Sequence, residues 1–346
     1  MACQVRILQP SDQDKWDAYV NGSPYGTIFH RTGWRHALEA VFPYRSMYLA
    51  AYDGEKLCGC LPLFHVKSVI AGQALLSVPF GVGGGLCAES PEVVACLLEH
   101  VRALAHDLQV EYVELRHGHN HWHLDLPSKS DLYVNFERPI DPDVEANMAA
   151  IPRKQRRMIR QGSKYGFTST LDGKEALPDF YRVYAHSVRN LGTPVFPYRY
   201  FVALMDAFPD EARILSVWHE GARVAGVLTF FFRDRVMPYY GGAYKAYYAH
   251  AVNDFMYWEL MRIACERGYR RFDFGRSKRG TGPYEFKRHW GFAPVPLEYH
   301  YLLCRRKTIP NISPSNTKFQ PFIALWKRLP QSVANAVGPW LIRYFP

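Results

Sequence analysis

Two stretches of similar sequence, one in each half of the chain, decide the fold. The second half carries Ile214-Leu-Ser-Val-Trp-His-Glu-Gly221 and then Val224-Ala-Gly-Val-Leu-Thr-Phe-Phe231. The first half carries Met47-Tyr-Leu-Ala-Ala-Tyr-Asp-Gly54 and then Leu57-Cys-Gly-Cys-Leu-Pro-Leu-Phe64. Each pair predicts a β-hairpin, because two apolar runs flank a short turn at Asp53-Gly54 or Glu220-Gly221. Gly54 precedes Gly221 by 167 residues (221 − 54), and Gly59 precedes Gly226 by the same offset (226 − 59), so we expect two copies of one structural unit.

The elements after each hairpin also follow the same order. A further strand is expected at residues 75–80 and 236–240, then a helix, then a closing strand at 112–115 and 271–274. The first helix begins at Ser90-Pro91, where serine suits the N-cap and proline the first helical position. Its counterpart spans about residues 253–267. This order predicts an α/β (α+β) fold in which mixed central sheets are flanked by helices.

Length and composition indicate a folded chain of two domains. The chain has 346 residues, of which 48% are hydrophobic and 21% charged. Its formal net charge of +10 favours an anionic partner such as nucleic acid, a nucleotide-sugar, an anionic glycan or a membrane surface. The seven cysteines are odd in number and form no Cys-x-x-Cys pair, so we expect a reducing, cytoplasmic compartment. We expect neither a signal peptide nor a membrane span, because no run approaches the ~20 apolar residues that a span needs.

The stretch from Arg270 to Phe292 contains the most chemistry. After the closing strand, a glycine-rich loop holds Arg276, Lys278 and Arg279 within four positions. Cations on such a loop at the end of a strand suit a phosphate or another oxyanion. The alternative is a solvated basic turn, because charge runs are usually solvated.

Three motifs here carry a resemblance to a known family. They are Asp273-Phe-Gly-Arg-Ser277, Tyr284-Glu-Phe-Lys-Arg-His-Trp-Gly-Phe292 and Pro296-Leu-Glu-Tyr299. Together they resemble FemAB-like proteins, which are related to peptidoglycan-bridge aminoacyltransferases, and in particular the branch associated with exosortase/PEP-CTERM exopolysaccharide systems. The resemblance implies tandem GNAT-like acyltransferase domains. It also implies amide formation on an amino group of a peptidoglycan- or exopolysaccharide-related cell-envelope precursor, nucleotide- or lipid-linked, with aminoacyl-tRNA as the donor.

The donor can be judged partly from a missing motif. GNAT acetyltransferases hold the coenzyme A pyrophosphate on a glycine-containing loop between the fourth strand and the next helix. Residues 242–250 lack the glycines that let backbone approach phosphate, and residues 81–85 are glycine-rich without forming the motif. Acetyl-CoA is therefore disfavoured but not excluded. The alternatives are an acyl-CoA- or acyl-carrier-dependent acyltransferase and a non-catalytic GNAT scaffold that binds a polysaccharide assembly.

Lys287 is the main candidate for catalysis. A cation among aromatic side chains would stabilise the oxyanion of acyl transfer, with Tyr284 beside it. Asp273 is either a general base or a hydrogen-bond anchor at the end of a core strand. We expect no tightly bound cofactor and no metal site, although His117, His119, His121 and His123 alternate.

The predicted substrate-binding residues come from several parts of the chain. Arg153, Arg156, Arg157 and Arg160 share one helical face and suit an acidic polymer, tRNA or pyrophosphate; the alternative is a solvated linker helix. A similar Arg-Arg-x-Ile-Arg motif occurs in the FemAB-like family. His30 lies in Phe29-His-Arg-Thr-Gly-Trp34, which resembles a family motif, and it is either a catalytic or a structural histidine. The full set is Arg276, Ser277, Lys278, Trp290, Arg153, Arg156, Arg157, Arg160, Tyr240, His30, Trp34 and Thr193.

The expected domain boundaries follow from the repeat. Residues 1–135 and 177–305 are the two GNAT-like domains, 136–176 a basic connecting segment, and 306–346 an amphipathic tail. The tail places Phe319, Phe322, Ile323 and Trp326 at helical spacing beside Lys318, Lys327 and Arg328. It either packs on the core or contacts the inner face of the membrane peripherally.

Overall fold

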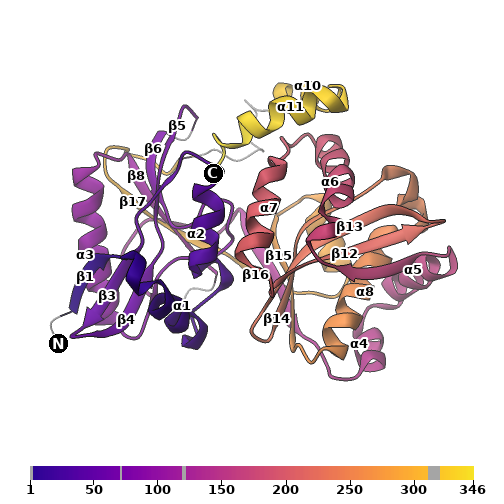
Figure 1. The fold of residues 1–346 in the computed structure, drawn as a ribbon, viewed down its shortest axis with the longest axis horizontal. Helices are drawn as coiled ribbons and strands as arrows, with labels where there is room; N and C mark the ends of the chain where they lie inside the picture. Colours follow the sequence, from indigo (N-terminus) through magenta and orange to yellow (C-terminus); the bar gives the residue numbers. More distant parts are fainter. Residues whose placement is uncertain (1–2, 71, 119–121, 311–319) are drawn as a thin grey trace. The chain divides into compact units, whose positions relative to one another are not determined.

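The computed structural model describes residues 3–70, 72–118, 122–310 and 320–346. Its contacts divide the chain into two compact units (Figure 1). Unit 1 comprises Met1–Tyr133, Pro296–Asn316 and Leu341–Pro346, and unit 2 comprises Val134–Val295 and Thr317–Trp340. These boundaries differ from the expected ranges: residues 136–176 lie inside unit 2, and residues 296–305 lie in unit 1.

Unit 2 is built on one sheet of seven strands. The order across the sheet is β11, β12, β13, β14, β15, β10 and β16. The hairpin expected at residues 214–231 is confirmed, with Glu220 and Gly221 in the left-handed region of the turn. The strands are β10 (Tyr133–Pro139), β11 (Thr168–Asp172), β12 (Ala212–His219), β13 (Ala222–Phe232), β14 (Arg235–Ala243), β15 (Arg271–Lys278) and β16 (Pro294–Pro296).

The parallel strands β14 and β15 pair only where they begin. Their ladder joins Arg235 with Arg271 and Val236 with Phe272, whereas β14 continues to Ala243 and β15 to Lys278. The two strands therefore separate as they run, and β10 lies on the other side of β15. This separation leaves the carboxyl end of β15 free of β14.

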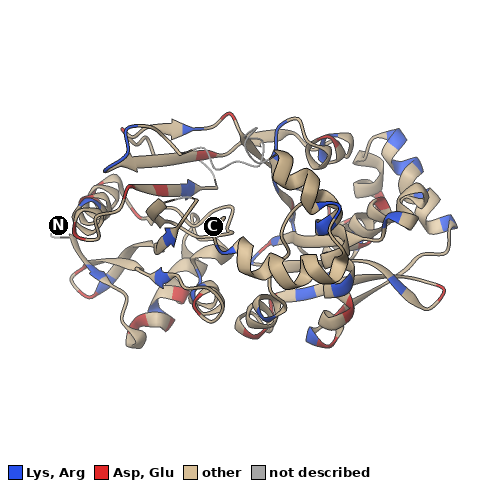
Figure 2. Ribbon diagram, turned by 90° about the horizontal axis from the view of Figure 1, so that it is seen from above, with Lys and Arg blue, Asp and Glu red and all other residues tan. Residues whose placement is uncertain are grey.

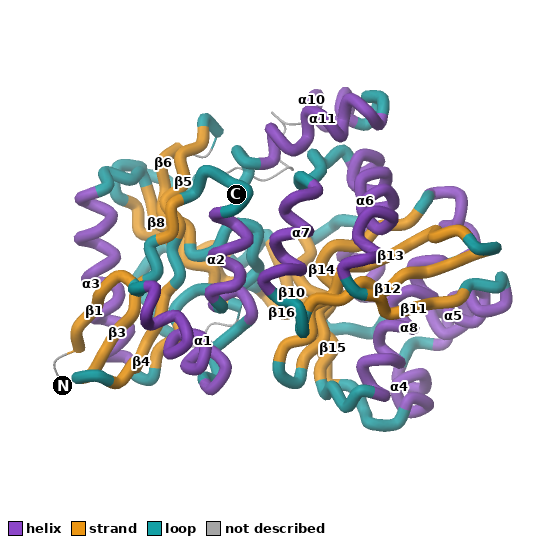
Figure 3. Tube along the Cα trace, in the orientation of Figure 1, coloured by secondary structure: helices purple, strands orange, loops and turns teal. Residues whose placement is uncertain are grey.

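Helices cover both faces of this sheet (Figures 1 and 3). A Cβ built on Gly226 of β13 would lie 3.2 Å from Phe180 of α6, whereas the neighbouring Val227 belongs to the core that α8 fills. Because successive strand residues point to opposite faces, α6 and α8 lie on opposite sides. The helices are α4 (Val144–Ala150), α5 (Arg153–Lys164), α6 (Leu177–Leu191), α7 (Tyr198–Ala207), α8 (Val252–Glu266) and α9 (Gly282–His289).

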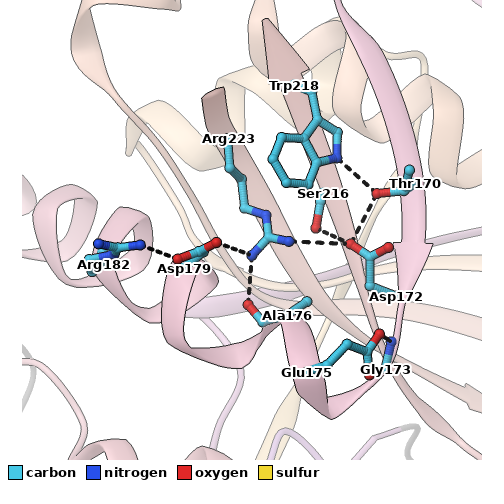
Figure 4. A network of polar contacts seen from close by, with 10 residues as sticks. All are labelled: Thr170, Asp172, Gly173, Glu175, Ala176, Asp179, Arg182, Ser216, Trp218 and Arg223. Atoms are coloured by element: carbon cyan, nitrogen blue, oxygen red, sulfur yellow. Dashed lines mark hydrogen bonds and ion pairs between the residues drawn. The ribbon is translucent and has the colours of Figure 1, made fainter. Parts of the chain in front are cut away.

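A buried arginine attaches the first turn of α6 to the hairpin (Figure 4). The Arg223 guanidinium lies 3.5 Å from Asp172 Oδ2 and 3.6 Å from Asp179 Oδ2, and it donates to the Ala176 carbonyl oxygen at 2.7 Å. Its carbon also lies 4.6 Å from the Trp218 ring centroid. Arg223 therefore joins β11, α6 and the β12–β13 hairpin through charge and stacking.

Unit 1 has two sheets where unit 2 has one. The expected strand at residues 57–64 is divided at Pro62: β4 ends at Leu61 and β5 begins at Phe64 in a different sheet. Proline has no N–H to donate to a ladder, which explains the break. One sheet has the order β1 (Cys3–Ile7), β3 (Leu49–Asp53), β4 (Lys56–Leu61) and β7 (Cys87–Ala88). The other has the order β2 (Arg45–Ser46), β5 (Phe64–Ser68), β6 (Gly72–Leu76), β8 (Tyr112–His117), β17 (Glu298–Leu303) and β9 (Ser128–Lys129).

Unit 1 has the predicted helix that begins at Pro91 and two helices before it that were not predicted. They are α1 (Gln13–Gly22), α2 (Thr32–Glu39) and α3 (Pro91–Asp107). The predicted start of α3 is confirmed, because the Ser90 hydroxyl accepts from the Val93 N–H and Pro91 begins the helix. Late in the chain, β17 pairs antiparallel with β8, which places Pro296–Leu297–Glu298–Tyr299 in unit 1.

The tail forms α10 (Gln320–Trp326) and α11 (Gln331–Ile342). Arg189 of α6 donates to the carbonyl oxygen of Leu329 in the tail at 3.0 Å. Gly192 packs closely against Ile323 of α10, and Gly338 of α11 packs closely against Val195. One side of the tail thus packs on unit 2, whereas Leu325, Val333 and Val337 are exposed. Phe319 and Lys318 lie outside the described residues. None of the described helices is long and apolar enough to span a membrane.

Candidate active site

The site predicted around Lys287 lies where β15 ends and α9 packs beside it. The Lys287 Nζ donates to the carbonyl oxygens of Gly275 at 2.9 Å and Arg276 at 3.1 Å. It also lies 5.8 Å from the Phe136 ring centroid. Burial lowers the pKa of Lys287 to about 7, Asp273 acts to raise it and Arg276 to lower it further. The lysine therefore holds the end of β15 and titrates near neutral pH.

Asp273 is buried and lies two residues before Gly275 in β15. Its Oδ1 accepts from Asn135 Nδ2 at 2.9 Å and from the Gly275 N–H at 2.8 Å, and its Oδ2 lies 4.0 Å from Arg235. Burial, and next the Glu137 charge, raise the pKa of Asp273. The carboxylate is thus both a hydrogen-bond anchor for the turn and a base stronger than an exposed aspartate.

The sequence reasoning missed the residues of β10 and β14 that contact Asp273. Asn135 orients the carboxylate, and Glu137 pairs with Arg235 at 3.1 Å and Arg271 at 2.9 Å. The Asn135 Oδ1 is buried without a hydrogen-bond partner among the described residues. No local pattern in residues 134–139 marks them, because their role depends on β10 lying next to β15.

Arg276, Ser277 and Lys278 were predicted in a loop, but they belong to β15, which continues to Lys278 beside this group. Arg276 and Lys278 are half-buried, and Tyr284 packs edge-on against Phe136 with ring centroids 5.4 Å apart. Ser277 is buried, with a hydroxyl that has no hydrogen-bond partner among the described residues. The structure therefore brings Asp273, Arg276, Ser277, Lys278, Tyr284 and Lys287 to one end of β15.

Trp290 and Tyr240 have different surroundings from those predicted for substrate-binding residues. Trp290 is 0% exposed, packs against Phe274 and donates from Nε1 to Asp254 Oδ1 at 3.3 Å. It therefore belongs to the core, as a correction to its predicted contact with substrate. Tyr240 is also buried, and its hydroxyl lies 3.2 Å from that of Tyr200 within an aromatic cluster on the α6–α7 side.

His30 has a structural place in unit 1. Its Nδ1 accepts from the Thr27 N–H at 3.1 Å, and its Nε2 lies 2.9 Å from the Gly85 carbonyl oxygen. Burial lowers the pKa of His30 to about 4, so the ring is neutral and donates from Nε2. Trp34 is fully buried against Phe29, whereas Thr193 of unit 2 is exposed and donates its N–H to the Val188 carbonyl oxygen.

The four arginines lie on the outer side of α5. Arg153, Arg157 and Arg160 are exposed and Arg156 is half-buried, whereas Gln155, Ile159 and Gly162 are buried. Among the described residues, no carboxylate lies within ion-pair distance of these four guanidinium groups. Figure 2 shows the lysine and arginine positions along the ribbon. The predicted basic face therefore exists and lacks acidic partners within the described part of the chain.

The buried side of α5 closes the N-terminus of α8. Gln155 donates from Nε2 to Asp254 Oδ1, Gln161 donates to the Ala249 carbonyl oxygen at 2.8 Å, and Gly162 abuts Phe255. Residues Lys245–His250, between β14 and α8, form a 3-10 helix. A helical turn therefore occupies the place where GNAT acetyltransferases have their pyrophosphate-binding loop. The carboxylate of Asp254 lies in the first turn of the helix that follows, α8.

The alternating histidines begin at His117, the last residue of β8. His117 is buried and packs edge-on against His300 of β17 with ring centroids 5.3 Å apart. Its Nε2 accepts from the Leu86 N–H at 3.3 Å. His119 and His121 lie outside the described residues.

The family comparison covers most of unit 2. Residues 148–288 match the family model described as the acetyltransferase (GNAT) domain. This part of unit 2 is therefore similar to a GNAT acetyltransferase domain. This domain spans α5, α8, β15 and most of α9, so it includes Asp273 and Lys287, and it supports assignment of the protein as an acyltransferase. The comparison with curated protein sequences gave no match.

Solved structures extend the likeness beyond the GNAT domain. FemX has a TM-score of 0.71 at 15% identity, over 94% of this chain and 100% of FemX. The C-terminal domain of a putative lysylphosphatidylglycerol synthetase from Agrobacterium fabrum has a TM-score of 0.54 at 12% identity, over 86% of this chain and 92% of that one. A tandem GNAT protein from the clavulanic acid biosynthesis pathway has a TM-score of 0.53 at 10% identity, over 87% and 98%. At such identities the likeness concerns the fold, and it confirms the predicted tandem GNAT architecture.

Proposed function

We propose that the protein is a FemAB-like N-acyltransferase that forms an amide on an amino group of a cell-envelope precursor. The acceptor would be peptidoglycan- or exopolysaccharide-related and the donor aminoacyl-tRNA. The observation that carries the proposal is the half-buried Lys287 amine beside Asp273, in the part of β15 that has separated from β14, within the residues that match the GNAT domain model. The likeness to FemX agrees with the family that the motifs resemble.

The chemistry assigned to these residues is acyl transfer. The acceptor amine attacks the donor carbonyl carbon, a C–N bond forms, and the ester C–O bond to the tRNA ribose breaks. Lys287 uses two N–H groups on backbone carbonyls, so its ammonium form has one left for the developing oxyanion. Asp273 would accept the amine proton, because its raised pKa makes it a better base, and would pass that proton to the ribose oxygen as it leaves, which gives the amide and the free tRNA hydroxyl.

The closed N-terminus of α8 supports a donor other than coenzyme A. In GNAT acetyltransferases, backbone N–H groups at this position hold the pyrophosphate. Here the Asp254 carboxylate takes hydrogen bonds in the first turn of α8, and α5 packs over it. A second anion at the same helix end would be repelled by the first. We therefore assign phosphate binding to the outer face of α5, where Arg153, Arg157 and Arg160 are exposed.

The tail supplies a second proposed partner, the anionic inner face of the membrane. Leu325, Val333 and Val337 are exposed, and Lys327 and Arg328 lie beside them. Apolar side chains with adjacent cations suit an interface with anionic lipid. Such a contact would suit a lipid-linked acceptor.

The test is a turnover assay with two donors. Purified protein is incubated with bulk tRNA charged with 14C-labelled amino acids, or with 14C-acetyl-CoA, together with nucleotide-linked and lipid-linked muramyl peptides. We expect base-stable label on an acceptor from charged tRNA and no label above background from acetyl-CoA. Transfer from acetyl-CoA alone would favour the coenzyme A-dependent alternative, and binding of an acceptor without any turnover would favour a scaffold.

A further inference from the structure

Asp254 is a buried carboxylate at a junction of three helices, and no step of the proposed chemistry uses it. It lies in the first turn of α8 and is 7% exposed, between core residues Val252 and Phe255. A buried carboxylate needs hydrogen-bond donors, because desolvation of an unpartnered charge is costly. Its own backbone N–H supplies one.

The other two donors come from different elements and meet at one atom. Gln155 of α5 donates from Nε2 to Asp254 Oδ1, and Trp290, the C-cap residue of α9, donates from Nε1 to the same oxygen at 3.3 Å. Both donor side chains are buried. A single oxygen atom thus ties α5 and α9 to the start of α8.

Backbone packing brings the same elements together. Gly291, the residue after Trp290, has φ of 81°, and a Cβ there would lie 3.1 Å from Cδ of Pro152, the residue before α5. Farther along α5, a Cβ on Gly162 would lie 2.8 Å from Cβ of Phe255. The close approaches leave little room for α5 to slide without breaking the contacts at Asp254.

The two helices carry the two parts of the proposed site. Gln155 lies between Arg153 and Arg156 on α5. On α9, the Trp290 N–H donates to the Lys287 carbonyl oxygen at 3.2 Å, so Trp290 is one turn from the lysine. A displacement at Asp254 would therefore move the guanidinium groups and the lysine relative to each other.

We infer that Asp254 is a positioning residue, whose Oδ1 holds the basic face of α5 and the Lys287 turn of α9 in one fixed arrangement. It acts through Gln155 and Trp290 and does not contact the substrate. The expected change in kcat and KM rests on the proposed function. The expected change in hydrogen exchange of α5 and α9 does not.

The experiment compares three variants of the full chain. Asp254→Leu removes the acceptor oxygen and Asp254→Asn keeps it. Leu204→Ala is the control, because it creates a cavity at a buried residue of α7 away from the junction. Hydrogen exchange is measured over residues 153–164 and 282–291, and kcat and KM are measured with bulk charged tRNA. In Asp254→Leu we expect at least tenfold faster exchange in both segments, at least tenfold lower kcat and higher KM. We expect Asp254→Asn to stay within threefold of wild type and Leu204→Ala to change neither segment selectively.

Several outcomes would overturn the inference. One is hydrogen exchange as slow as in wild type in both segments of Asp254→Leu. Another is faster exchange confined to these two segments in Leu204→Ala. A third is exchange in Asp254→Asn as fast as in Asp254→Leu. If Asp254→Leu does not fold, Gln155→Leu should loosen α5 alone and Trp290→Phe should loosen α9 alone, and unchanged exchange in both would refute the inference. If wild type shows no turnover with either donor, the proposed function fails while the exchange measurements still decide the role of Asp254.

Discussion

The side-chain nitrogen of Lys287 lies 2.9 Å from the carbonyl oxygen of Gly275. Gly275 has φ of 71°, a left-handed conformation that glycine adopts without strain. The lysine thus holds the backbone of β15 at the left-handed Gly275, two residues after the buried Asp273. Because the amine is already held by backbone, its remaining N–H has a fixed direction, which is what oxyanion stabilisation requires.

Replacing Lys287 should lower turnover without unfolding the chain. We expect Lys287→Ala to cost about 2–4 kcal/mol of transition-state stabilisation in kcat, as removal of one oxyanion donor does. Steady-state kinetics with charged tRNA measures the loss, and circular dichroism with thermal unfolding checks the fold. An unchanged kcat in a folded variant would remove Lys287 from the mechanism.

The dependence of kcat/KM on pH should show whether Lys287 acts as a cation that stabilises the oxyanion or as a general base. The pKa of Lys287 is lowered to about 7, so its cation is lost above that pH. A lysine-type acceptor amine gains its neutral form up to a pH of about 10. The two effects oppose each other, so kcat/KM should rise to about pH 7 and then level off. In Lys287→Arg, whose side chain stays charged, kcat/KM should keep rising above pH 7. If Lys287→Arg is inactive and kcat/KM of the wild type keeps rising above pH 7, Lys287 acts as a base instead.

The basic face of α5 should act on binding more than on chemistry. A double Arg156→Ala, Arg157→Ala variant should raise KM for charged tRNA at least tenfold at low salt and change kcat little. The defect should shrink as salt rises, because salt screens the wild-type contact. The matched control is Lys67→Ala with Arg102→Ala, which removes the same charge from exposed positions of unit 1. Equal affinity and equal salt dependence in both variants would make the α5 face a solvated surface.

Arg223 and Arg182 offer a comparison of buried and exposed ion pairs, since both pair with Asp179. The side chain of Arg223 is 8% exposed and that of Arg182 is 73% exposed. Arg223→Ala should lower the free energy of unfolding by about 3 kcal/mol, because it leaves Asp172 without its cation. Arg182→Ala should cost less than about 0.5 kcal/mol. Urea unfolding followed by tryptophan fluorescence measures both, and equal losses would contradict the role of the network in Figure 4.

His30 should make the stability of unit 1 depend on pH. Its pKa is about 4 in the fold and 6.5 in the unfolded chain, so between these values only the unfolded state binds the proton. Stability should therefore fall as pH drops from 6.5 to 4, by on the order of 3 kcal/mol. Asp254, with a pKa raised to about 6, contributes the opposite slope over part of this window. The informative quantity is thus the difference between wild type and His30→Asn, and a difference that does not change with pH would show that His30 is not buried as a neutral ring.

Local patterns were enough to predict the repeated elements. The hairpins at a 167-residue offset, the Ser90–Pro91 start of α3 and the arginine face of α5 all depend on neighbours within one or two turns or across one tight turn. Signals of this kind lie in consecutive residues, so the order of strands and helices in the two units could be predicted from them. The alternation of Phe272 and Phe274 around Asp273 likewise marked β15 correctly.

The tertiary structure alone decided which elements meet. A strand pattern shows which face is buried but not which strand lies beside it, so the places of β10 next to β15 and of β17 next to β8 had no local signal. For the same reason Asn135 was missed, and Trp290 was predicted at the substrate although its ring is buried and donates to Asp254. The sequence by itself determined the two folded units and the residue types of the site. Long-range packing determined that Lys287 holds the end of β15 and that Asp254 ties α5 to α9, because burial and hydrogen-bond partners come from residues distant in the chain.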